Sequence, residues 1–80
     1  MTYADLLQIT ANVLPIVGYV ELSRVFTEEG QFLGYKFSCR SNDAVDIIDE
    51  QIKAHPNYSP FEVATQKVKR GAKEVLVVIR

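Results

Sequence analysis

The sequence predicts a small α+β fold: a three-stranded, largely antiparallel sheet with helices packed on it, in the order α-β-β-α-α-β. Three observations support this class. Two segments with alternating apolar and polar residues flank a polar loop that contains glycine, as in a β-hairpin. Three other segments combine an N-cap residue with apolar residues at helical spacing. The run Val75–Ile79 is apolar throughout, which is typical of a strand inside a sheet.

The first predicted helix starts after Thr2, which pairs with Asp5 in a weak capping box. Its apolar stripe contains Tyr3, Leu6, Leu7, Thr10, Val13 and Leu14. We expect the helix to run to about Asn12, because Pro15 disfavours a helical residue before it.

Two strands are predicted next, over 16–26 and 32–40, joined by the polar loop 27–31. The second strand has the clearest alternation in the chain. It places four residues on the core face: Leu33, Tyr35, Phe37 and Cys39.

The second and third predicted helices follow in succession. Residues 41–43 supply N-caps for the second, which carries Val45, Ile48 and Ile52 and stops at residues 55–57. The third begins at Ser59, with Pro60 at its first position and Glu62 completing a capping box. Its stripe is Phe61, Ala64, Thr65 and Val68, and Gly71 ends it.

A crossover through two helices favours strand order 2-1-3, with the last strand antiparallel beside the first, as in a split β-α-β arrangement. The alternative places the last strand parallel beside the second. The apolar character of the last strand indicates that the second face of the sheet is covered, by the first helix or by a second copy of the chain.

Composition limits the function classes. The chain has 80 residues, which predicts a single domain over 1–80, and a net charge of −1, which argues against nucleic acid as a partner. The single cysteine, Cys39, excludes an internal disulfide and favours a cytoplasmic location. No apolar run is long enough to span a membrane, and the N-terminus does not resemble a signal peptide.

The sequence contains no catalytic or metal-binding motif, so we predict no enzyme activity, cofactor or metal. His55 stands alone at a helix end before Pro56, and Cys39 is expected to be a packed thiol. The acidic residues of the second helix are expected to form a solvated face: Asp43, Asp46, Asp49 and Glu50.

We therefore predict a non-catalytic protein-interaction module, such as an adaptor, inhibitor or regulatory subunit, that can form a homodimer. Partner contact is expected through a sheet face and a basic turn. The candidate residues are Tyr19, Tyr58, Lys67, Lys69, Arg70 and Lys73. Tyr19, Val17 and Val78 are expected to leave an apolar patch on the sheet face away from the helices.

The element order resembles that of bacterial-type KH domains, which implies nucleic-acid binding as an alternative. In that family a G-x-x-G loop between adjacent helices clamps the nucleic-acid backbone, whereas the matching residues 54–59 here contain no glycine. The segment Gln66–Ile79 is similar to the helix, glycine turn and strand that close small phycobilisome linker domains.

Overall fold

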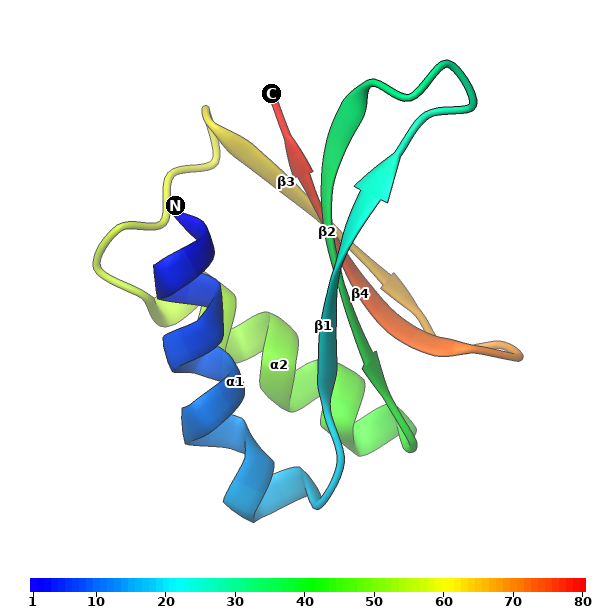
Figure 1. The fold of residues 1–80 in the computed structure, drawn as a ribbon. Helices are drawn as coiled ribbons and strands as arrows, with labels where there is room; N and C mark the ends of the chain where they lie inside the picture. The colour runs from blue at the N-terminus through cyan, green and yellow to red at the C-terminus, as the bar shows by residue number, and fades with distance from the viewer.

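The computed structural model describes all 80 residues and has two layers, a four-stranded antiparallel sheet and two helices on one of its faces (Figure 1). The elements are α1 (Tyr3–Val17), β1 (Glu21–Phe26), β2 (Phe32–Cys39), α2 (Asn42–Ala54), β3 (Val63–Val68) and β4 (Lys73–Ile79). The α+β class is confirmed. The three-stranded sheet is wrong, because the order is α-β-β-α-β-β and the strands run β1-β2-β4-β3 across the sheet.

The predicted third helix does not form, and β3 occupies most of that segment. The capping signals at Ser59 produce a single helical turn, in which the Ser59 carbonyl accepts hydrogen bonds from the N–H groups of Glu62 and Val63 at 3.0 and 3.1 Å. The chain then extends and pairs with β4 over six consecutive residue pairs. Because local propensity is a weak preference, strand pairing with the apolar β4 overrides it.

The predicted strand order 2-1-3 is wrong for the same reason. The last strand, β4, lies between β2 and β3 and is antiparallel to both. The alternative prediction placed the last strand beside β2, which is correct, but parallel to it, which is wrong. The β3–β4 hairpin reverses the chain once more and makes β4 antiparallel to β2. β2, α2 and β3 form a split β-α-β unit with β4 inserted between its two strands.

Both helices begin at the predicted caps. The Thr2–Asp5 capping box is present at α1, and the Ser41 side chain accepts from the N–H of Ala44 at 3.0 Å at the start of α2. α1 continues beyond the predicted end at Asn12, with Pro15 inside its last turn, and stops at Gly18 in the left-handed conformation with φ 79°.

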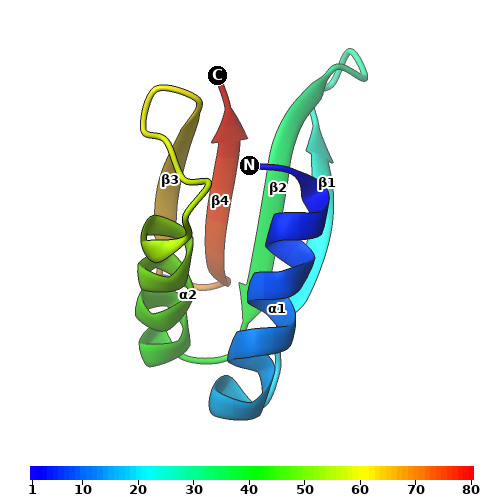
Figure 2. The same cartoon turned by 90° about the vertical axis from the view of Figure 1, so that its left-hand side faces the viewer.

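Both helices lie over the same face of the sheet (Figure 2). The core lies between the helices and the sheet, and its residues come from both layers. α1 contributes Leu6, Ile9 and Val13; α2 contributes Ala44, Val45, Ile48 and Ile52; the strands contribute Phe37, Cys39, Val63, Val75 and Val77. The core-facing position of Cys39 is confirmed, with 8% of the residue exposed. Val17 also packs against this core, so its predicted place in a patch on the other sheet face is wrong.

Neither helix has the length and apolar character that crossing a bilayer requires.

Candidate functional site

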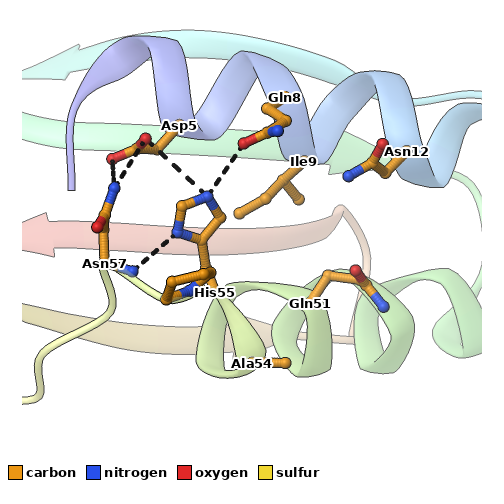
Figure 3. A pocket seen from close by; sticks show the side chains of 9 residues that line it. Asp5, Gln8, Ile9, Asn12, Gln51, Ala54, His55 and Asn57 are labelled. Atoms are coloured by element: carbon orange, nitrogen blue, oxygen red, sulfur yellow. Dashed lines mark hydrogen bonds and ion pairs between the residues drawn. The ribbon is translucent and has the colours of Figure 1, made fainter.

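A polar groove lies between the start of α1 and the end of α2 and encloses about 410 Å³ (Figure 3). Its lining residues are Asp5, Gln8, Ile9, Asn12, Gln51, Ala54, His55, Pro56 and Asn57. Pro56 and Asn57 follow the α2 C-cap, His55. The groove is the largest concave feature of the molecule, which makes it the first candidate for a ligand-binding or catalytic site.

Hydrogen bonds occupy both ring nitrogens of His55. The main-chain N–H of Asn57 donates to Nδ1 at 3.1 Å, so Nδ1 is an acceptor. The ring proton therefore belongs on Nε2, which donates to Oε1 of Gln8 at 3.2 Å. The Asp5 carboxylate lies 3.9 Å from Nε2. Neither nitrogen is left free to act on a ligand.

Asp5 joins the same network from α1. It accepts hydrogen bonds from the main-chain N–H of Thr2 at 2.9 Å and from Nδ2 of Asn57 at 3.2 Å. These bonds, with the Thr2 N–H as the largest contribution, hold the pKa of the Asp5 carboxyl below its ordinary value. The hydrogen bonds of Asp5, His55 and Asn57 thus link the first turn of α1 to the end of α2. This network acts as a structural brace between the two helices.

The acidic residues of α2 do not share one environment. Asp49, expected on a solvated face, is 5% exposed. One carboxylate oxygen accepts from Nζ of Lys53 at 3.0 Å, while the other has no hydrogen-bond partner. This contact with Asp49 raises the pKa of Lys53. No group of three or more His, Cys, Asp or Glu side chains is arranged to hold a metal ion.

Three of the four residues of the predicted basic turn are bonded within the chain. Nζ of Lys69 lies 2.8 Å from the Asp46 carboxylate, and Nζ of Lys67 lies 3.3 Å from it. The bond from Lys69, followed by that from Lys67, holds the pKa of Asp46 below its ordinary value. Nζ of Lys73 donates to the Lys69 carbonyl at 2.7 Å. Arg70 is exposed and makes no ion pair, so it is the free cation of the turn.

The structure separates the two predicted tyrosine anchors. The Tyr19 hydroxyl donates to Glu21 at 2.7 Å, a bond that raises its pKa, and the Arg40 guanidinium lies 4.2 Å from its ring centre. Arg40 follows Cys39, which pairs with Lys73, so Tyr19 is at the same end of the sheet as the basic turn. Tyr58 packs against the core beyond the α2 C-cap, away from that end.

The sheet face opposite the helices, called the open face below, has no cover (Figure 1). Side chains alternate between the two faces of a strand, so the residues between the core positions point here. They are Glu21, Ser23 and Val25 in β1, Lys36 and Ser38 in β2, Ala64, Gln66 and Val68 in β3, and Glu74, Leu76 and Val78 in β4. The end of this face beside the β1–β2 hairpin is apolar, and the other half carries the Lys36–Glu74 ion pair at 3.9 Å.

A small apolar depression of about 30 Å³ lies in the apolar half of the open face, over Gly34. Val25, Leu33, Leu76 and Val78 are among its lining residues. A Cβ atom at position 34 would run into the carbonyl oxygen of Val77, so only glycine fits there. The missing side chain at position 34 leaves the depression between its neighbours.

The prediction placed Leu33 on the core face, and this is wrong. The β1–β2 register shifts from Val25↔Gly34 to Phe26↔Phe32, so Leu33 is the extra residue of a β-bulge. Leu33 is exposed and lines the depression. The sequence prediction therefore missed Leu33 as a surface residue and Gly34 as a buried lining residue of the depression. The only available signal was the glycine inside a strand pattern.

No family model matches the chain, and no curated protein or solved structure matches it either. The resemblance to KH domains rested on two adjacent helices before the last strand, and the second of these is β3. The resemblance to phycobilisome linker domains assumed a helix before Gly71, where the structure has a β-hairpin.

Proposed function

We propose that the chain is a small, non-catalytic protein-interaction module, an adaptor, inhibitor or regulatory subunit, that binds a protein partner through the open face and the basic turn. One observation carries the proposal. Both helices pack on the same side of the sheet, which leaves the apolar depression over Gly34 and its rim uncovered. Uncovered apolar surface on a sheet marks a place where another molecule docks.

The open face is arranged as interfaces usually are. Val25, Leu33, Leu76 and Val78 gather at one end, and the adjoining half carries polar or charged residues, among them Lys36 and Glu74. An apolar centre with a polar rim is the common anatomy of protein–protein contacts. Arg70 adds an unpaired positive charge at the opposite end of β4, where it can select an acidic partner surface.

A non-catalytic role is supported by the polar groove. Its histidine and carboxylate bond to residues of the chain itself, Gln8, Asn57 and Thr2. A general base needs a ring nitrogen or carboxylate oxygen free to reach a substrate proton. The groove is built to hold two helices together.

We extend the proposal to a cytoplasmic location. Cys39 is a single buried thiol, and burial raises its pKa. A chain without disulfides suits a reducing compartment.

The test is a quantitative capture from source cells with three baits. The baits are the natural chain, a Leu33→Lys/Leu76→Lys double variant of the open face, and an Ile16→Lys control. Ile16 is 66% exposed on α1, so its substitution also replaces exposed apolar surface by charge, but away from the open face. A specific partner should bind the natural chain and the Ile16→Lys control equally and lose at least about tenfold in affinity for the double variant.

The basic turn is tested with Arg70→Glu. This variant should slow association and weaken its salt dependence relative to the natural chain, whereas the Ile16→Lys control should change little. A partner that binds the Leu33→Lys/Leu76→Lys variant with unchanged affinity and loses affinity for Ile16→Lys would contradict the proposal.

A further inference from the structure

The outer edge of β3 carries main-chain groups that point out of the sheet. The Glu62 carbonyl accepts from the N–H of Arg80 at 2.8 Å, one position beyond the Val63↔Ile79 pair. In antiparallel sheets, residues that bond to a given neighbour alternate with residues that point away from it. The even-numbered residues Ala64, Gln66 and Val68 therefore bond to β4, and the odd-numbered residues Val63, Thr65 and Lys67 face outward.

Most of these outward groups have no partner. The Val63 N–H is taken by the Ser59 carbonyl, but the N–H and C=O of Thr65 and Lys67 make no hydrogen bond to loops or side chains. A row of free donors and acceptors on an edge strand is a template for another strand.

The opposite edge of the sheet is protected in a way that β3 is not. β1 contains the register shift at Val25/Phe26, and the Arg24 side chain from this strand stacks on Tyr3. Bulges and charges at an edge oppose pairing with other chains. β3 pairs with β4 without any shift and contains neither proline nor glycine. Its one charged residue, Lys67, is paired with Asp46 at 3.3 Å.

We propose that two copies of this chain associate through β3, antiparallel about a two-fold axis at Thr65. In this register every outward residue meets an outward residue: Thr65 faces Thr65 of the second copy, and Val63 faces its Lys67. The Thr65 N–H and C=O then bond reciprocally across the axis, and a cross-strand pair of threonines is favourable.

Charge selects this arrangement over its alternatives. Glu62 precedes β3 and lies 3.8 Å from the N-terminal ammonium. Lys67, Lys69 and Arg70 lie at the end of β3 or follow it, and Asp46 balances only one of these three charges. Antiparallel pairing brings the Glu62 end of each copy against the basic end of the other. A register centred on Lys67 would oppose like charges, and parallel pairing would align the basic ends.

Pairing through β3 would give one continuous sheet with all helices on one side and both open faces on the other. The inference does not use the open face, but the end of the β3 edge belongs to the basic turn of the proposed function.

The test exploits the two-fold axis. Thr65→Lys and Thr65→Glu each place identical charges across the axis, whereas a one-to-one mixture places opposite charges there. Sedimentation equilibrium should show the natural chain rising from monomer to dimer with concentration. Each variant alone should have its dimer dissociation constant raised about tenfold or more, and the mixture should recover association.

Two controls separate this contact from others. Circular dichroism and thermal melting confirm that both Thr65 variants remain folded. Leu76→Lys changes the open face and should leave dimerisation unchanged. The inference would be overturned if the natural chain stays monomeric, if the Thr65 variants associate like the natural chain, or if Leu76→Lys abolishes the dimer. A monomeric chain would leave the β3 edge free for an extended segment of another protein. Loss of the dimer in Leu76→Lys would indicate pairing through the open face.

Amide hydrogen exchange gives a second readout with the natural chain alone. Exchange of the Thr65 and Lys67 amides should slow about tenfold or more between monomer and dimer concentrations. The outward amides of β1, Leu22 and Arg24, serve as the internal reference and should not respond. Thr65 exchange that does not depend on concentration would contradict the inference.

Discussion

Gly34 on β2 packs against the carbonyl oxygen of Val77 on β4, closer than any side chain at position 34 would permit. Gly34 and Val77 both line the depression on the open face. The bulged Leu33 beside it supplies the rim. One glycine therefore connects the packing of the sheet with the surface proposed to bind a partner.

Replacing Gly34 by alanine should destabilise the fold by about 2–4 kcal/mol, because the new Cβ forces the main chain of β4 to move. The matched control is Gly30→Ala. Gly30 also has a positive φ, 85°, but nothing lies within 4 Å of its Cβ position, so only the backbone strain of about 1 kcal/mol applies. Urea unfolding of both variants measures the difference. Equal losses would show that the Val77 contact does not limit position 34.

Stability should fall in acid partly through Asp46. Lys69 and Lys67 hold its pKa in the folded state below the ordinary value of 3.8. The unfolded chain therefore binds the proton first, so this contribution is present above pH 3.8 and is lost as the pH falls through the folded-state pKa.

Asp46→Asn should flatten the loss of Tm between neutral pH and pH about 3. Asp43→Asn, at an exposed residue of the same helix without an ion pair, is the control and should leave the slope close to natural. If both variants follow the natural chain, Asp46 does not couple to folding.

The brace between helices should show as energetic coupling. His55→Ala and Gln8→Ala each remove one end of the Nε2–Oε1 bond of 3.2 Å. A double-mutant cycle should give a coupling of about 0.5–1 kcal/mol in unfolding free energy. Gln51→Ala, on the same groove but without a hydrogen bond, should couple to His55→Ala by less than about 0.3 kcal/mol. Absence of any His55–Gln8 coupling would refute the brace.

Cys39 should be unreactive in the folded chain. Burial raises its pKa and keeps it a thiol, and Sγ lies 3.5 Å from the Lys73 carbonyl. Reaction with an aromatic disulfide reagent at pH 8 should be slower than for the urea-unfolded chain by about a hundredfold or more, limited by opening of the β2–β4 region. Stoichiometric modification within the mixing time would contradict the core position.

Local signals predicted the parts of the fold that depend on neighbouring residues. The Thr2–Asp5 capping box, the Ser41 cap and the alternation of β2 from Tyr35 to Cys39 all concern groups a few residues apart, and each is present. The bulge at Leu33 breaks the alternation at the start of β2. The same kind of signal was wrong at Ser59, because its capping bonds do form but close only one turn. The apolar residues of Val63–Val68 fit the spacing of a strand as well as that of a helix. Pairing with β4, which has β2 on its other side, decides in favour of the strand.

The candidate surfaces depended on contacts that no local pattern encodes. The open face exists because both helices pack on one side, and the depression requires the Gly34–Val77 contact between strands far apart in the sequence. The His55–Gln8 bond joins residues 47 positions apart. The basic turn was predicted from composition, but its pairing with Asp46 follows only from α2 lying against β3.

The central claim is that the open face binds the partner, and methyl NMR tests it most directly. With a partner captured as above, the methyl signals of Val25, Leu33, Leu76 and Val78 should shift or broaden in proportion to bound fraction. Those of Leu7, Leu14 and Ile16, exposed on α1, are the internal control and should stay in place. Perturbation of the α1 methyl groups with an unchanged open face would contradict the claim.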